Sequence, residues 1–236
     1  MSGLQSWSTT AINLPEHSDN AVHTDAGARA AGFERALVAG TSVYAYLTHP
    51  PMAAWGTAWL GHGGGELRLR RPVCDGDRVD CVIAAGDAGP IVEGRVGDDV
   101  QASLELWERA DAPPIRDGER FPDIELRLTE AQRTYGTRAG DGLGIYAEQH
   151  IVHPVVWANL SNTVFKHNLV TGPWVHTRSR IFHEGVAGDG ALLRVESTLV
   201  DRFDSRAGER ALVDIRILAD DAPVATIEHE AIVALA

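Results

Sequence analysis

The chain has 236 residues, of which 44% are hydrophobic and 23% are charged, so it can bury a sizeable core and is not expected to be disordered. Its 21 basic and 33 acidic residues give a net charge of −12, which repels phosphate backbones and anionic lipid surfaces. We therefore expect neither nucleic acid nor a membrane as a partner. With no basic, apolar leader and no run of 18 apolar residues, the expected location is the cytoplasm.

Residues that commonly bind metals form no familiar pattern. Cys74 and Cys81 are seven positions apart, which matches no zinc knuckle, and we expect two reduced thiols. The ten histidines include no HxxxH or HExxH pair. No nucleotide-binding glycine motif is present either. The expectation is that the protein uses neither a metal nor another cofactor.

The first half predicts one long helix followed by strands. The helix begins near Leu37–Gly40, continues to about Leu47, and is expected to end at Pro50 and Pro51. A glycine-rich loop at 63–65 follows. Strands are predicted after it at 66–73, 78–84, 91–96 and 100–107.

The second half repeats this order of signals. Between the halves, 110–123 has three prolines and no hydrophobic period, which is typical of a linker. A helix is predicted at 155–165, with Pro154 in its first turn. Strands are predicted after it at 174–182, 191–200, 212–218 and 224–233.

The spacing of these signals indicates an internal duplication. Gly40 and Asp77 are 37 residues apart, and Pro154 and Asp189 are 35 apart. Each half is interpreted as a principal helix wrapped by four mostly antiparallel strands. The two sheets are expected to pair edge to edge, because that covers edges which a single half leaves open.

One segment of the first half resembles a known signature. It reads Asn20–Ala21–Val22–His23–Thr24–Asp25, followed by Ala30–Ala31–Gly32–Phe33 and Leu37–Val38–Ala39–Gly40. This pattern is similar to that of MaoC-type hydratases and dehydratases, hot-dog enzymes that act on acyl thioesters. The resemblance implies an α+β double hot-dog fold. Its repeats would be 1–109 and 124–236, joined by the linker 110–123.

The resemblance also implies site residues. In that family, a segment of the form G-D-x-N-P-x-H supplies an aspartate and a histidine as the acid/base pair, and a later glycine begins the central helix and binds the thioester carbonyl. Matched by position, His23 takes the histidine place and Asn20 the asparagine place. Gly40 and Thr41 take the oxyanion or substrate-binding place. Hydration of an enoyl thioester needs a base, an acid and donors to the carbonyl oxygen as it gains charge.

The match departs from the family where its aspartate should stand. Ser18 occupies that position, and Asp19 is displaced by one residue. We expect Asp19 to act with His23, because Asp25 is well placed to cap a helix instead. In the second repeat, the expected glycine and aspartate are present, but a tyrosine replaces the histidine. The residues kept in reserve as acid or base are Asp25, Asp141 and Tyr146.

Three functions remain open at this point. The resemblance favours an (R)-specific enoyl-thioester hydratase or 3-hydroxyacyl-thioester dehydratase. The alternatives are a hot-dog thioesterase and a non-catalytic acyl-thioester binder or partner subunit. The expected substrate partner is an acyl-CoA or an acyl-carrier protein, and a homodimer is left open. Among single residues, Gly40 has an alternative role in packing, and His176 and His229 are expected to be structural histidines with satisfied hydrogen bonds.

Overall fold

The computed structural model describes residues 3–235 and contains a single antiparallel sheet of 11 strands. The strands are β1 (Trp7–Thr10), β2 (Gly64–Leu69), β3 (Arg78–Ala85), β4 (Pro90–Val96), β5 (Asp99–Trp107), β6 (Glu119–Arg120), β7 (Ile124–Arg127), β8 (Val175–His183), β9 (Leu192–Ser205), β10 (Gly208–Ala219) and β11 (Ala222–Leu235). Their order across the sheet is β1-β3-β4-β5-β2-β8-β11-β10-β9-β6, and β7 also pairs with β9.

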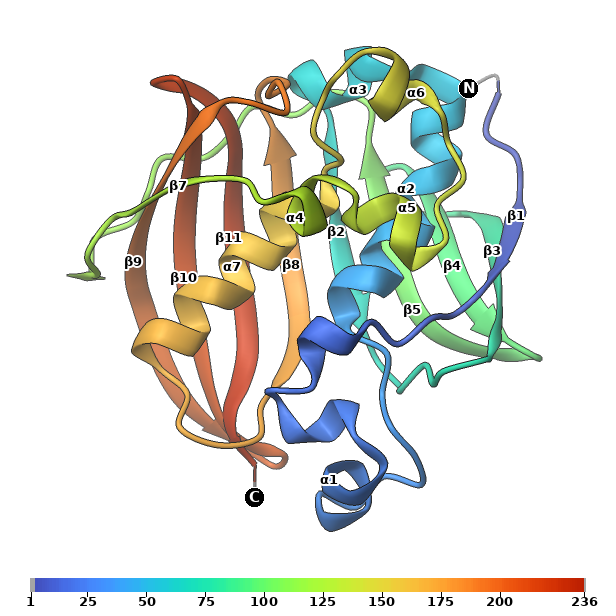
Figure 1. The fold of residues 1–236 in the computed structure, drawn as a ribbon, viewed down its shortest axis with the longest axis vertical. Helices are drawn as coiled ribbons and strands as arrows, with labels where there is room; N and C mark the ends of the chain where they lie inside the picture. Colours follow the sequence, from blue (N-terminus) through green and yellow to red (C-terminus); the bar gives the residue numbers. More distant parts are fainter. Residues whose placement is uncertain (1–2, 236) are drawn as a thin grey trace.

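Two long helices lie on the same side of this sheet and contact each other (Figure 1). They are α2 (Gly40–Trp55) and α7 (Val155–Asn168). The shorter α-helices are α1 (Asp25–Ala30), α3 (Thr57–His62), α4 (Glu130–Arg133), α5 (Tyr135–Ala139) and α6 (Ile145–Glu148), and the 3-10 helices are η1 (Pro15–His17) and η2 (Ala21–His23).

Each half of the chain has the predicted order of one long helix followed by four strands. Helix α2 precedes β2 to β5, and α7 precedes β8 to β11. The two groups of strands join through β2 and β8, whose antiparallel register places Leu67 opposite Ser179. The predicted edge-to-edge pairing is therefore confirmed.

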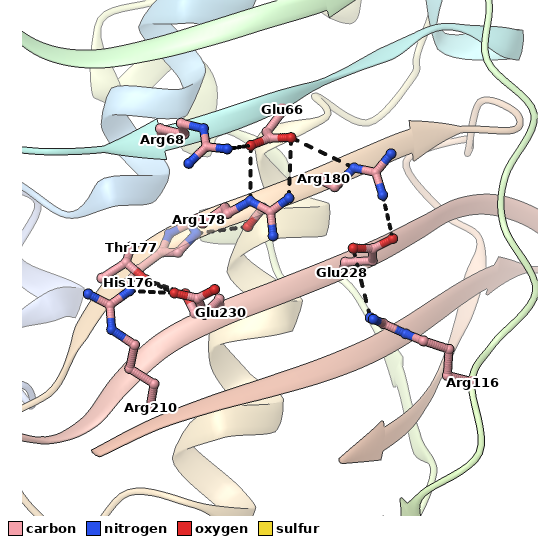
Figure 2. Close-up of polar contacts among 11 residues, drawn as sticks. Glu66, Arg68, Arg116, His176, Thr177, Arg178, Arg180, Arg210, Glu228 and Glu230 are labelled. Carbon is pink, nitrogen blue, oxygen red and sulfur yellow. Dashed lines mark hydrogen bonds and ion pairs between the residues drawn. The ribbon is translucent and has the colours of Figure 1, made fainter. Parts of the chain in front are cut away.

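The junction between the halves carries a row of ion pairs on its outer face. Figure 2 shows the carboxylate of Glu66, on β2, beside Arg178 and Arg180 of β8. Nε of Arg178 lies 3.0 Å from Oε1 of Glu66, and Nη1 of Arg180 lies 2.8 Å from Oε1 of Glu228 on β11. Partly exposed pairs of this kind stabilise a fold by about 1 kcal/mol or less each. Their main effect is to place opposite charges next to each other on neighbouring strands.

The prolines in α2 do not end the helix, so that prediction was wrong. Pro50 and Pro51 lie inside α2, which continues to Trp55. Proline lacks the N–H that would bond to the carbonyl of Tyr46, four residues earlier. The thiol of Cys81 donates to that carbonyl at 3.4 Å. This replacement donor, together with burial of most of the helix, keeps the chain helical there.

The predicted linker packs against the second group of strands. Its residues 119–120 form β6, which pairs with β9 at the end of the sheet, and Nε of Arg116 donates to Asp214 at 2.9 Å. The buried carboxylate of Asp214 lies on β10. The segment that connects the halves is therefore attached to the second one. In the described part of the chain, no helix is long and apolar enough to cross a membrane.

Candidate functional site

A cavity of about 310 Å³ lies at the N-terminal end of α2. Figure 1 shows η1, η2 and α1, in blue, gathered at this end of the helix. The walls come from both halves: the segment 17–43 and the end of β2 from the first, and α7 with the start of β8 from the second. The cavity is thus built where the two halves of the chain meet.

His23 lines this cavity at the end of η2. Its Nδ1 lies 2.7 Å from the carbonyl oxygen of Leu37. Because a carbonyl can only accept, Nδ1 carries the proton and Nε2 of the neutral ring keeps its lone pair. Burial lowers the pKa of His23 below its ordinary value of 6.5, against a smaller opposing effect of the Leu37 carbonyl. A neutral imidazole of this kind can act as a base.

Asp19 is not hydrogen-bonded to His23. Its Oδ2 lies 2.7 Å from Nζ of Lys166, on α7, and its side chain is 60% exposed. Asn20 is buried, and its Nδ2 donates to the carbonyl of Trp174 at 3.0 Å. Two consecutive residues of the signature thus attach the N-terminal segment to the second half of the chain.

Asp25 has a structural role, but it is not the helix cap that we expected. Thr24, rather than Asp25, caps α1, because its hydroxyl accepts from the amide of Gly27 at 3.2 Å. The expectation that Asp25 is the N-cap was therefore wrong. Asp25 stands one residue later, in the first turn, where its Oδ1 accepts from the amide of Ala36 at 2.9 Å.

Gly40 begins α2, as predicted from its place in the signature, and it also lines the cavity. A Cβ added here would overlap Cδ1 of Leu69 and lie 3.2 Å from Nδ1 of His176. Amides in the first turn of a helix have no intrahelical acceptor, so this end of α2 can donate to a ligand. Thr41 is buried outside the cavity wall, with its hydroxyl 2.9 Å from that of Tyr135.

A second histidine of the cavity was missed by the sequence reasoning. The ring centroid of His17 lies 5.5 Å from that of His23. Its Nε2 is 2.7 Å from the hydroxyl of Tyr135, which comes from the other half of the chain. Burial is the largest cause that lowers the pKa of His17 to about 4. Only its position between Pro15 and the signature could have drawn attention to it.

Asp141 and Tyr146 lie in a different cluster. Oδ2 of Asp141 is 2.8 Å from Nε2 of His153, and Oδ1 is 2.6 Å from Nδ1 of His49. The ring of Tyr146 packs on His153 at 4.3 Å between centroids. Neither reserve residue lines the cavity, and His49 is nine residues along α2 from Gly40, or roughly 14 Å at the helical rise. Asp141 and Tyr146 are therefore not partners of His23.

Basic side chains gather at the cavity in an otherwise acidic protein. Arg70 and Arg71 follow β2, Lys166 lies on α7, and Arg210 comes from β10. Arg71 pairs with Asp99, and Arg210 pairs with Glu230, whereas Arg70 is exposed with no ion pair within residues 3–235. This local charge favours an anionic ligand. Among the described residues, no group of three or more His, Cys, Asp or Glu side chains could hold a metal ion.

Two further histidines differ from their expected role. His176 and His229 are buried, but Nδ1 of His176 and Nε2 of His229 have no hydrogen-bond partner within residues 3–235. The expectation that both are satisfied was therefore wrong. His176 lines the cavity beside Gly40.

No family model and no curated protein matches the sequence. The fold, in contrast, matches many solved structures. A protein from Chloroflexus aurantiacus, named as a MaoC domain dehydratase, is 14% identical and aligns with a TM-score of 0.62 over 98% of this chain and 95% of its own. A Mycobacterium tuberculosis protein described as a double hot dog is 14% identical, with a TM-score of 0.60 over 98% and 96% of the two chains.

Other structures of the same fold are named for a different reaction. A Lactobacillus plantarum protein, named as an oleoyl thioesterase, is 8% identical and aligns with a TM-score of 0.56 over 100% of this chain and 99% of its own. Identities this low show that the fold is shared, and they do not show which activity this chain has. The expected α+β architecture is confirmed: the chain has the double hot-dog fold, which it shares with MaoC-like dehydratases.

Proposed function

We propose that the chain is a hydratase or dehydratase of acyl thioesters, acting on a CoA- or carrier-bound acyl group in the cavity at the start of α2. The observation that carries this proposal is the environment of His23. Its Nδ1 is held by the Leu37 carbonyl at 2.7 Å, and its Nε2 has no hydrogen-bond partner within residues 3–235. A fixed, neutral imidazole in a cavity is suited to proton transfer.

In the hydration direction, Nε2 of His23 takes a proton from water, and the water oxygen forms a bond to C3 of the enoyl group. The C2=C3 electrons shift towards the thioester carbonyl, whose oxygen gains negative charge and accepts from amides at the start of α2. The imidazolium then returns its proton to C2, which restores the neutral ring. Dehydration is the same sequence in reverse.

Asn20 supports this chemistry as the residue that orients water. Its Nδ2 is held by the Trp174 carbonyl, whereas its Oδ1 is buried without a partner among the described residues. A buried acceptor in this state costs free energy unless a ligand or water satisfies it. Water held by Oδ1 of Asn20 would satisfy this acceptor in the cavity that His23 also lines.

The basic side chains support a phosphate-bearing carrier. Arg70, Arg71, Lys166 and Arg210 all line the cavity. CoA and the phosphopantetheine arm of a carrier protein both bring phosphate groups, and arginine binds phosphate through paired N–H donors. Arg70 makes no ion pair within residues 3–235, so its guanidinium is available to such a phosphate.

Binding without turnover is the second candidate. The observation that favours it is that no carboxylate within residues 3–235 hydrogen-bonds to His23, since Asp19 is paired with Lys166. A thioesterase is less favoured by the same observation, because hydrolysis on this frame would use a carboxylate near the helix start.

Incubation with crotonyl-CoA and a longer enoyl-CoA tests the proposal. We expect loss of the enoyl-thioester absorbance without release of free thiol. His23→Ala should reduce the rate at least about 100-fold. His167→Ala, which removes an exposed histidine of α7, should leave it unchanged. Thiol release would indicate hydrolysis instead, and binding with neither change would favour the non-catalytic candidate.

A further inference from the structure

Two histidines and a serine form a buried hydrogen-bonded chain beside the cavity. Nε2 of His176 and Nδ1 of His229 each lie 2.8 Å from Oγ of Ser179. The two rings stack with centroids 4.2 Å apart, and the three residues are 6%, 0% and 0% exposed for His176, Ser179 and His229. This hydrogen-bonded chain ends at Nδ1 of His176 on one side and at Nε2 of His229 on the other.

A bulge in β8 brings His176 and Ser179 together. Arg178 pairs with Glu230, and His176 pairs with Ala231, so Thr177 is an extra residue in β8. In a regular strand, residues three apart point to opposite faces. The bulge turns both His176 and Ser179 inwards, whereas Arg178 stays on the outer face with Glu66 (Figure 2).

Nδ1 of His176 lies next to the first residue of α2. A Cβ built on Gly40 would be 3.2 Å from this nitrogen, and both residues line the cavity. Helix α2 is 16 residues long, and the amides of its first turn lack intrahelical acceptors. The cavity therefore has a backbone donor group and an unpartnered imidazole nitrogen side by side.

The positions of the protons follow from the two end nitrogens of the hydrogen-bonded chain, Nδ1 of His176 and Nε2 of His229. Burial lowers the pKa of His176 to about 4 and that of His229 well below 6.5, so both rings are neutral at pH 7. Oγ of Ser179 can accept from either ring, but its single hydroxyl proton can go to only one of them.

The free nitrogen of His229 decides which ring donates. Its Nε2 is buried without a partner among the described residues, and the ring packs on Phe165 at 4.9 Å. A proton on this nitrogen would have no acceptor, whereas His176 lines the cavity, where a substrate oxygen can accept from Nδ1, so Nε2 of His229 is the unprotonated nitrogen. His229 then donates through Nδ1 to Ser179, Ser179 donates to Nε2 of His176, and His176 carries its proton on Nδ1.

We propose that Nδ1–H of His176 donates a hydrogen bond to the thioester carbonyl oxygen of the substrate, beside the amides at the start of α2. This inference rests on the proposed function and adds a catalytic residue to it. Ser179 and His229 are positioning residues, because they hold the tautomer and orientation of His176 without touching the substrate. Loss of one donor to such an oxygen typically reduces kcat about 100- to 1,000-fold.

Three variants separate this role from packing. His176→Phe keeps an aromatic ring on His229 but removes the donor, and Ser179→Ala breaks the chain. Ser197→Ala is the matched control, because it removes another buried hydroxyl of the second half, on β9. The rate measured is hydration of crotonyl-CoA, and folding is checked by circular dichroism and thermal unfolding.

The decisive readout is the infrared stretch of a ¹³C-labelled thioester carbonyl in bound butyryl-CoA, which has no double bond to hydrate. Hydrogen bonds to the oxygen lower this frequency. We expect the lowering to be smaller in His176→Phe and Ser179→Ala than in wild type and in Ser197→Ala. For crotonyl-CoA, we expect kcat to fall about 100-fold or more in His176→Phe, with little change in KM.

The tautomer can also be measured in the wild-type protein, which keeps the test valid if a variant fails to fold. Two-bond ¹H–¹⁵N correlation spectra should show the proton of His176 on Nδ1. Finding it on Nε2 would overturn the proposal, as would equal carbonyl frequencies in wild type and His176→Phe, or no binding of butyryl-CoA. A frequency shift that depends on His176 without any hydration would overturn the proposed function while supporting the carbonyl contact.

Discussion

Asp141 and His153 form a buried hydrogen bond, with 2.8 Å between Oδ2 of Asp141 and Nε2 of His153. His153 stands two residues before the start of α7. The other oxygen of Asp141 accepts from His49 of α2, whose ring stacks on Trp7 at 3.8 Å. The second half thus has the carboxylate and histidine pair that the cavity lacks. Both residues are 2% exposed and lie outside the cavity wall, so the pair connects α2 to α7 instead of facing a substrate.

Asp141→Asn should therefore reduce stability and spare catalysis. Replacing a buried carboxylate that accepts two hydrogen bonds typically costs about 1–3 kcal/mol, because the donors lose their charged acceptor. The bonds to His153 and His49 outweigh burial and lower the pKa of Asp141 from 3.8 to about 2. Its stabilising effect is thus complete above pH 4 and is lost as the pH falls towards 2.

Urea unfolding at pH 7 and pH 3 measures this effect. The difference in the free energy of unfolding between wild type and Asp141→Asn should be larger at pH 7 than at pH 3. The hydration rate of the folded variant should stay within a few-fold of the wild-type rate. The exposed Asp201→Asn is the control. A variant as stable as wild type, or one that folds but has lost hydration, would contradict this assignment.

The pH dependence of hydration should report the base. His23 must be neutral to accept a proton, and burial lowers its pKa below 6.5. We therefore expect kcat/KM for crotonyl-CoA to stay level as the pH falls through 6.5 and to decline only below it. A decline with its midpoint above 6.5 would show that another group is the base.

Substitutions of Asp19 and of Lys166 should shift the acidic decline of kcat/KM in opposite directions. The charge of Lys166 lowers the pKa of His23, and the charge of Asp19 raises it. Lys166→Met should thus move the acidic limb of kcat/KM to higher pH, and Asp19→Asn should move it to lower pH. Because the pair is partly exposed, with Lys166 at 32% and Asp19 at 60%, the free energy of unfolding should change by less than about 1 kcal/mol.

The variant Asp19→Asn also tests whether Asp19 transfers a proton. If it does, Asp19→Asn should lose hydration about 100-fold or more at every pH. If Asp19 acts only through its charge, the loss should be small near pH 7, where His23 is neutral in both proteins. Steady-state rates between pH 5 and pH 8 distinguish these outcomes.

Gly40→Ala should impair hydration more than stability. The new methyl group displaces Cδ1 of Leu69, a mobile side-chain end, but it also crowds Nδ1 of His176. Misplacement of catalytic groups by about 1 Å can cost 100-fold in rate, whereas overpacking typically costs about 1–3 kcal/mol. The double variant Gly40→Ala with Leu69→Ala should recover stability but not the rate. Recovery of both would show that Gly40 serves packing alone.

The order of elements followed from local patterns. Alternating hydrophobic residues marked β2 to β5 and β8 to β11, and the similar spacing of the turns in the two halves indicated the duplication. These signals depend on neighbours in the chain, so they are readable without a fold. The continuation of α2 through Pro50 was not readable, because the thiol that replaces its missing donor comes from Cys81 on β3.

The candidate site shows the same division. His23, Asn20 and Gly40 of the signature all line one cavity, because short segments around a helix start keep these residues close. His23 has its partner, the Leu37 carbonyl, in the same half, whereas the partner of Asn20 comes from the other half. Lys166 takes the carboxylate of Asp19 across 147 positions, and a bulge at Thr177 turns His176 towards Gly40. Sequence patterns thus predicted the fold, because they depend on neighbours in the chain, whereas long-range packing decided which charged and polar groups meet at the cavity.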